Sequence, residues 1–174
     1  MDCGMKKFIY ILFSLLYLSS CTKQDRDNMI IDQEKSIDTY LSGLGEDVRI
    51  VRDGGASRVV ITEGEGEEIV AGDSVIFYYA GYIFSNGKGA LFATNNKEVA
   101  LENDFQTQGL PERKVVGESG LIPGLNSGLT GARKGEVCHI MFSARYGYGN
   151  TVVYNVPKLS PLFFEIWIES VIKN

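Results

Sequence analysis

Alternation of apolar and polar residues dominates the carboxy-terminal half of the chain and predicts β-strands there. In "SPLFFEIWIES" every second side chain is apolar, and these four are expected to face a core: Leu162, Phe164, Ile166 and Ile168. The side chains between them are expected to face outward: Phe163, Glu165, Trp167 and Glu169. Asn95–Pro111 is polar and irregular and is expected to be a surface loop. Because "GDSVIFYYAGYIF" and "EVCHIMFSARYGYG" alternate similarly, the pattern predicts an antiparallel sheet of several strands.

One segment between these strands, "VVGESGLIPGLNSGLTGARKGE" from Val115 to Glu136, combines helical spacing with many glycines. Apolar residues recur in it at the spacings of one helical face: Leu125, Leu129 and Ala132. Each glycine destabilises a helix by about 1 kcal/mol relative to alanine, so another requirement must favour it. We expect a short helix near Gly124–Ala132, with Gly128 and Gly131 permitting a close approach to the sheet.

Residues 32–64 predict a helix followed by a β-hairpin. A short helix over Asp32–Leu41 would begin with Asp32 as its cap. In "VRIVRDGGASRVVITEG" the turn signal Asp53-Gly54-Gly55 is flanked by two apolar-rich strands, Val48–Val51 and Val59–Thr62. We expect this extension to cover the outer face of the sheet near Trp167.

The first 21 residues predict an export signal. Lys6 and Lys7 precede the apolar run Phe8–Leu18, which is too short to span a bilayer, because a spanning helix needs about 20 residues. "LSSC" ends at Cys21 and resembles a bacterial lipobox, whose cysteine is lipidated and becomes the first mature residue. An ordinary signal peptide that contains a cysteine is the alternative. Polar residues 22–31 would then form a tether to the domain.

The composition of the chain indicates its class and argues against some functions. The hydrophobic content of 44% and charged content of 22% are typical of a globular protein. The formal net charge of −5 argues against nucleic-acid binding, which favours a basic surface. If Cys3 leaves with the signal and Cys21 carries lipid, only Cys138 remains, so no internal disulfide is expected. The alternation of Cys138 with Ile140 and Phe142 predicts a small buried side chain.

Candidate catalytic or metal-binding side chains are few. His139 is the sole histidine, and it is expected to face outward with Val137 and Met141, which disfavours a metal site or a general base there. Four carboxylates form what we interpret as a solvated turn, with calcium binding as a minor alternative: Glu63, Glu65, Glu67 and Glu68. The sequence therefore predicts no metal and no cofactor.

Four segments resemble, in their order along the chain, the FKBP-type peptidyl-prolyl cis-trans isomerases: "GDSVIFYYAGYIFSNGKGALFATN", "VVGESGLIPGLNSGLTGARKGE", "SARYGYGN" and "VPKLSPLFFEIWI". The resemblance covers Gly72–Ile172. It implies an α+β fold, an FKBP-like antiparallel half-barrel sheet wrapped on one short helix, here with an N-terminal helix and hairpin extension. The chain then divides into a signal peptide with lipobox (1–21), a tether (22–31), the extension (32–64) and an FKBP-like domain (65–174).

The resemblance also implies a hydrophobic pocket for a prolyl ring between helix and sheet. The catalytic positions would be Tyr148, Ile122 and Tyr79. The substrate-binding positions would be Phe92, Leu121, Leu125, Val156 and Phe164. In the family, the backbone N–H at the Ile122 position and the hydroxyl at the Tyr148 position hydrogen-bond a substrate carbonyl, and Leu125 would form the pocket floor. Ala93 departs from the family pattern, which has an aspartate there.

The function implied is a folding catalyst that isomerises prolyl bonds of exported polypeptides at the cell envelope. A lipid on Cys21 would hold it in the outer membrane of a Gram-negative bacterium. Ala93 and the long 95–111 segment keep a second hypothesis open, a weakly catalytic module that binds prolyl peptides or acts as a chaperone. A lipoprotein that uses the fold only as a scaffold is a third. The sequence does not indicate an oligomeric state.

Overall fold

A computed structural model of the chain describes residues 3–118 and 120–174, with side chains from Lys23 onward. Its centre is one seven-stranded sheet in the order β1-β2-β6-β7-β3-β4, with β5 paired to β3. The strands are β1 (Ile50–Asp53), β2 (Ala56–Thr62), β3 (Ser74–Phe84), β4 (Lys88–Thr94), β5 (Glu112–Val115), β6 (Val137–Phe142) and β7 (Leu162–Ile172). Every pairing is antiparallel. The predicted α+β fold is confirmed.

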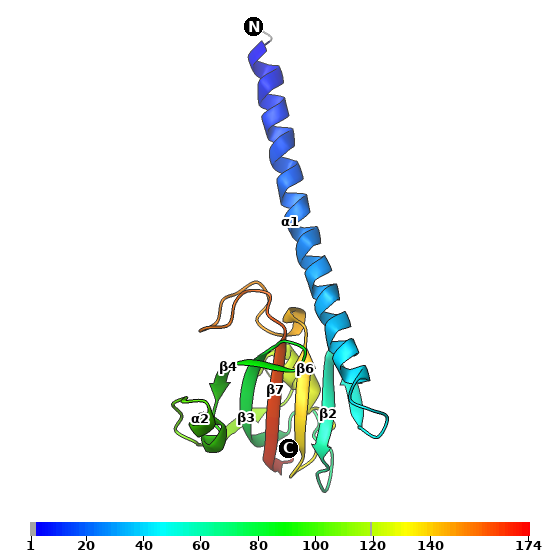
Figure 1. Ribbon diagram of the computed structural model, residues 1–174, viewed down its shortest axis with the longest axis vertical. Coiled ribbons are helices and arrows are strands. Elements are labelled where there is room, and N and C mark those ends of the chain that lie inside the picture. Colours follow the sequence, from blue (N-terminus) through cyan, green and yellow to red (C-terminus); the bar gives the residue numbers. More distant parts are fainter. Residues whose placement is uncertain (1–2, 119) are drawn as a thin grey trace.

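The two faces of the sheet belong to two separate cores. On the inner face, the four apolar residues predicted from β7 pack with the short helix α3 (Pro123–Leu129). Cys138 is fully buried in this inner core, as predicted, and burial raises the pKa of its thiol. On the outer face, Phe163 and Met141 pack with residues of the long helix α1 (Cys3–Ser42), including Ile37 and Leu41. Figure 1 shows the carboxy-terminal part of α1 lying beside the sheet near β2 and β6.

Helix α3 lies close to the sheet because glycines face the strands. A Cβ atom at Gly124 would overlap the ring of Phe142, and one at Gly128 would overlap Ile140. The predicted close approach is therefore present at Gly128. Gly131, however, lies beyond the helix, which ends at Leu129, three residues before the expected end. The C-cap Thr130 leaves the helix in an extended conformation, with φ −60° and ψ 132°, and Gly131 follows it at φ 76°.

The extension forms the predicted hairpin, with Gly54 and Gly55 at φ 50° and 85° in its turn. Its helix differs from the expectation. Instead of starting at Asp32, α1 runs without interruption through residues 22–31, which contain neither glycine nor proline to break it. The extension covers the outer face as expected. Trp167 packs against this outer core, to which the extension contributes, and a hollow beside it is lined by Lys97, Glu98 and Gly109.

Part of the expected surface loop is ordered as the short helix α2 (Lys97–Glu102). The Asn96 side chain caps it, accepting hydrogen bonds from the backbone N–H of Glu98 at 2.9 Å and of Val99 at 3.3 Å. The Val99 side chain is buried against the outer core. An asparagine cap thus organises a segment whose polar composition indicated only a loop.

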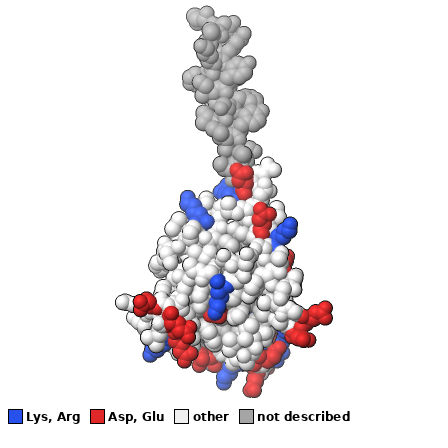
Figure 2. Space-filling model, viewed as in Figure 1, with Lys and Arg blue, Asp and Glu red and all other residues white. Residues whose placement is uncertain are grey.

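The predictions made for residues 1–21, the signal peptide and the lipidated Cys21, concern side chains outside the described part of the chain. Within the described residues, no helix is long and apolar enough to cross a membrane. Figure 2 shows one face of the molecule, on which acidic side chains gather toward the end away from α1, while Lys and Arg are more scattered.

Candidate functional site

A cavity of about 210 Å³ opens between α3 and the inner face of the sheet. Seven of the eight residues predicted for the site line it: Tyr79, Phe92, Leu121, Ile122, Leu125, Tyr148 and Phe164. Val156 is not among them. It is fully buried in the inner core, and its backbone is held by two hydrogen bonds with Val153, of 2.9 and 3.2 Å. Val156 therefore belongs to the inner core and not to the cavity lining.

Aromatic rings from separate strands form one wall of the cavity. The ring of Phe164 on β7 lies 5.7 Å from that of Phe92 on β4, edge to face, and 6.3 Å from that of Tyr79 on β3. Tyr148 completes the wall, with its ring 6.3 Å from Phe92. A Cβ atom at Gly81 would press on the rings of both Phe92 and Phe164, so glycine on β3 is needed for this packing. The wall is apolar and fixed by ring-to-ring contacts.

Two hydrogen-bond donors at the cavity are unpaired. Among the described residues, neither the backbone N–H of Ile122 nor the hydroxyl of Tyr148 has a hydrogen-bond partner. Burial, followed by the charges of neighbouring groups, raises the pKa of the Tyr79 and Tyr148 hydroxyls. Both hydroxyls therefore keep their protons at neutral pH. The cavity can offer two donors to a carbonyl oxygen without first breaking an internal bond.

Asn95 positions Tyr79, and sequence reasoning missed it. Its Oδ1 accepts a hydrogen bond from the Tyr79 backbone N–H at 2.6 Å, and its Nδ2 donates to the Phe77 carbonyl at 3.3 Å. The neighbouring Thr94 hydroxyl donates to the Tyr79 carbonyl at 2.8 Å. A side chain thus takes the place of a strand partner where the β3–β4 ladder ends. An asparagine directly after a predicted strand was the available signal.

Asn126 performs a similar role for the segment before α3. Its Oδ1 accepts from the Gly117 N–H at 3.0 Å, and its Nδ2 donates to the carbonyls of Glu118 and Leu121, at 3.2 and 3.3 Å. These bonds tie the glycine-rich segment to the helix that follows it. Ile122 lies between the two anchored parts, so its free N–H has a fixed position.

The rim of the cavity carries charge and an exposed ring. Glu112 and Lys114 on β5 form an ion pair of 2.9 Å, and both line the cavity. Tyr154 also lines it and is 90% exposed. On the wall, the position where the family has an aspartate is occupied by the methyl group of Ala93. The acidic group of the lining is therefore at the rim, paired with a lysine.

The described lining of this cavity contains neither histidine nor cysteine. Within the described residues, no group of three or more His, Cys, Asp or Glu side chains could hold a metal ion. His139 lies on the outer face, as predicted, with its Nε2 3.5 Å from a Glu165 carboxylate oxygen and its ring 5.0 Å from that of Phe163.

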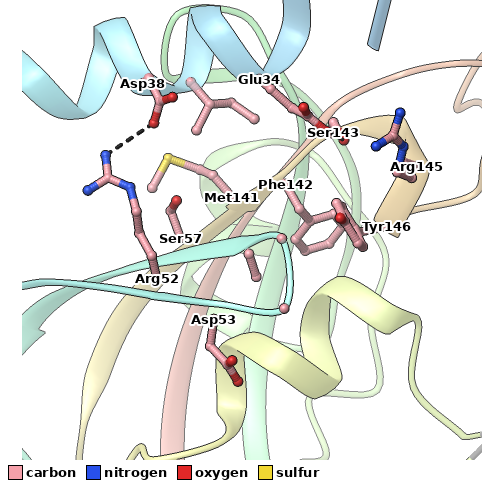
Figure 3. A pocket seen from close by; sticks show the side chains of 14 residues that line it. Glu34, Asp38, Arg52, Asp53, Ser57, Met141, Phe142, Ser143, Arg145 and Tyr146 are labelled. Carbon is pink, nitrogen blue, oxygen red and sulfur yellow. Dashed lines mark hydrogen bonds and ion pairs between the residues drawn. The ribbon is translucent and has the colours of Figure 1, made fainter. Parts of the chain in front are cut away.

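A second cavity, of about 390 Å³, lies between α1, the β1–β2 hairpin and the end of β6 (Figure 3). Charged side chains from α1 and the hairpin line it, including Asp38 and Arg52, whose ion pair measures 3.1 Å. None of the residues predicted for the site lies there. The smaller apolar cavity, with its free donors, is therefore the candidate functional site.

Comparison with known proteins agrees with this architecture. The family model described as "FKBP-type peptidyl-prolyl cis-trans isomerase" matches residues 65–169. FK506-binding protein 1 of Aspergillus oryzae (strain ATCC 42149 / RIB 40) is 28% identical over 116 residues, which cover 64% of this chain and 94% of that protein.

Two solved structures share the fold. The structure of the three FKBP domains of wheat FKBP73 matches with a TM-score of 0.62 and 23% identity, over 73% of this chain and 52% of that one. FkpA from Escherichia coli matches with a TM-score of 0.60 and 22% identity, over 99% of this chain and 73% of that one. Since the family model covers more than half of the sequence, the chain belongs to the FKBP-type peptidyl-prolyl cis-trans isomerase family.

Proposed function

We propose that the protein catalyses cis-trans isomerisation of prolyl peptide bonds in polypeptides, with the prolyl ring bound in the apolar cavity. One observation carries the proposal: the aromatic cavity has two unpaired donors, the Ile122 N–H and the Tyr148 hydroxyl. The apolar CH₂ groups of a prolyl ring suit the aromatic wall, and the adjoining carbonyl oxygen can accept hydrogen bonds from the donors. Rotation about a prolyl peptide bond requires neither a nucleophile nor a metal.

The chemistry of the bond explains why such a site suffices. Resonance stiffens the C–N bond, so rotation crosses a barrier of about 18–20 kcal/mol. As the bond twists, the resonance is lost and the amide becomes less polar, which an apolar cavity favours over water. Donors favour the transition state if they meet the carbonyl oxygen where the twisted amide, and not the planar one, places it. Leu125 and Phe164 would hold the ring while the chain on the other side rotates.

We further propose that the substrates are exported proteins and that a lipid on Cys21 anchors the enzyme in the outer membrane of a Gram-negative bacterium. The basic, apolar and small-residue pattern of residues 1–21 supports this location. Prolyl isomerisation takes tens to hundreds of seconds without catalysis, which is slow enough to limit folding after export.

Tyr148→Phe tests the catalytic proposal, because it keeps the ring and removes only the donor. A net hydrogen bond is worth about 0.5–1.5 kcal/mol, so kcat/KM in a protease-coupled prolyl peptide assay should fall about two- to twelvefold. Tyr40→Phe, which removes a hydroxyl on the outer face, is the matched control and should leave kcat/KM unchanged.

Ala93 favours a second candidate function, a module that binds prolyl peptides and turns them over weakly, since the wall lacks the family's carboxylate. This function replaces the first if the wild-type protein binds a prolyl peptide but shows no rate above background.

For the Tyr148→Phe test, equal kcat/KM values for the variant and wild type would show that the Tyr148 hydroxyl has no part in the mechanism.

A further inference from the structure

A single glutamine of α1 holds both ends of the segment that carries Tyr148. The Gln33 Nε2 donates a hydrogen bond to the Leu159 carbonyl at 2.6 Å, and its Oε1 accepts one from the Ala144 backbone N–H at 2.9 Å. Next to it, a Glu34 carboxylate oxygen accepts from the Ser143 hydroxyl at 3.1 Å. These α1 residues lie outside the region matched by the family model, which begins at residue 65.

The segment between these ends, residues 145–158, is otherwise held by short-range backbone hydrogen bonds, such as that from the Gly149 N–H to the Ala144 carbonyl at 3.0 Å, and by the burial of Val156 in the inner core. Its base is closed by a hydrogen bond from the Leu159 N–H to the Gly149 carbonyl, at 2.8 Å. Leu159 and Tyr154 have φ 56° and 52°, left-handed conformations that side chains other than glycine seldom adopt. Such conformations persist only where the surroundings impose them. Figure 1 shows the segment as the orange loop between β6 and β7.

A cavity interrupts part of the contact between α1 and the base of the segment. The larger cavity is lined by Ser143, Arg145 and Tyr146, so it separates this turn from α1 on one side (Figure 3). The hydrogen bonds of Gln33 and Glu34 join α1 to the base of the segment beside this cavity.

We propose that Gln33 is a positioning residue of the site: it fixes both ends of the Tyr148 segment, and α1 thereby sets the affinity for prolyl peptides. This inference rests on the proposed isomerase function. With the ends released, the segment samples conformations in which Tyr148 no longer closes the cavity. The apparent affinity then falls in proportion to the fraction of molecules in the competent conformation, while turnover of bound substrate is little changed.

Gln33→Met tests the proposal, because methionine keeps an unbranched chain of similar length and lacks both polar groups. We expect KM for a prolyl peptide, and Kd measured by titration, to rise about three- to tenfold with kcat nearly constant. Amide hydrogen exchange should become faster in residues 149–159 and stay unchanged in β3 and β7. The matched control is Asp38→Asn, which loses the ion pair from α1 to Arg52 on the hairpin but touches no residue of the segment. It should change neither KM nor exchange in the segment.

Three outcomes overturn the inference. One is unchanged exchange and Kd in Gln33→Met. Another is an equal rise in exchange across β3 and β7, which would make Gln33 a general stabilising residue. The third is an equal effect of Asp38→Asn, which would assign the effect to the docking of α1 as a whole. If wild type shows no isomerase activity, the proposed function fails, whereas exchange and peptide titration still test Gln33.

Discussion

Phe163 and Phe164 are neighbours on β7, yet one fills a closed core and the other lines an open cavity. On the outer face, three rings surround Phe163, those of His139, Tyr82 and Tyr40, at 5.0, 6.1 and 6.5 Å. On the inner face, three rings surround Phe164 at similar distances: Phe92, Phe142 and Tyr79, at 5.7, 5.8 and 6.3 Å. The sheet supplies both faces with comparable aromatic packing, so the sheet alone does not make the cavity.

The two faces of the sheet differ in the helix that covers each of them. On the outer face, α1 packs Ile37, Tyr40 and Leu41 against the strands. On the inner face, α3 has seven residues, and its glycines bring it onto Phe142 and Ile140. A helix this short cannot cover the rest of the face, which stays open beside Leu125. The cavity is therefore where the cover ends, and its edge is formed by the segments that carry Ile122 and Tyr148.

Each face also buries a carboxylate, and the two are stabilised differently. Beneath α3, Glu136 faces Arg58 of β2, with Nε and Oε1 3.4 Å apart and both side chains 2% exposed. Arg58 also donates to the Gly128 and Thr130 carbonyls, both at 3.3 Å. On the outer face, Glu165 accepts hydrogen bonds from Tyr82 and Lys88, at 3.0 and 2.9 Å. The extension thus contributes Arg58 to the inner face as well as its cover to the outer one.

Arg58→Met should lower the free energy of unfolding more than any other variant proposed here. Removing one partner of a buried ion pair leaves the other charge uncompensated, and this costs about 3–5 kcal/mol of the free energy of unfolding. Arg58 also donates hydrogen bonds to carbonyls at the end of α3, the helix beside the cavity. We therefore expect kcat/KM to decrease as well. Chemical denaturation and the prolyl peptide assay measure the two effects.

The double variant Arg58→Met with Glu136→Leu is the control for this prediction. Replacing both partners by apolar side chains removes the buried charge, so stability should recover much of the loss. A double variant as unstable as Arg58→Met would show that the carbonyl contacts at α3, and not the ion pair, stabilise this face.

Glu165→Gln should have the next largest effect on the free energy of unfolding, and only at pH values where the Glu165 carboxyl is ionised. Burial alone raises the pKa of the Glu165 carboxyl, but hydrogen bonds from His139, Lys88 and Tyr82 outweigh it and lower the pKa from 4.5 to about 2. Because the folded-state pKa is the lower one, the stabilisation is complete above pH 4.5 and is lost as the pH falls toward 2. A shift of this size corresponds to about 3 kcal/mol.

Denaturation curves of wild type and Glu165→Gln at several pH values test this expectation. The difference in unfolding free energy should be largest near neutral pH and should vanish near pH 2. Glu169→Gln, at an exposed position on the same strand, should match wild type throughout. A difference that is constant with pH would mean that shape, and not charge, is what Glu165 contributes.

The comparison of the two faces also shows what the sequence could predict. Alternation from Leu162 to Ile168 placed the side chains on their correct faces, because a regular strand has a period of two; after Ile168 a register shift against β3 interrupts it, and Val171 packs on the inner core. The order of the glycine-rich and tyrosine-containing segments brought seven site residues to one cavity. Arg58 could not be predicted as buried, since its partner Glu136 is 78 residues away in the chain. Gln33 gave no signal either, because a polar residue in a polar stretch of helix indicates exposure.

Ala93→Asp should give the smallest effect, a rise in kcat/KM. It tests whether a carboxylate on the wall of the cavity increases catalysis. A carboxylate at this position could accept a hydrogen bond from a tyrosine of the lining and orient it, which at about 0.5–1.5 kcal/mol raises kcat/KM about two- to twelvefold. Stability should fall somewhat, because a charge is placed against aromatic rings. Ala93→Asn is the matched control: it has the same shape without the charge and should raise kcat/KM less. If both variants catalyse at the wild-type rate in the prolyl peptide assay, the missing carboxylate does not limit the rate, and the donors at Ile122 and Tyr148 suffice.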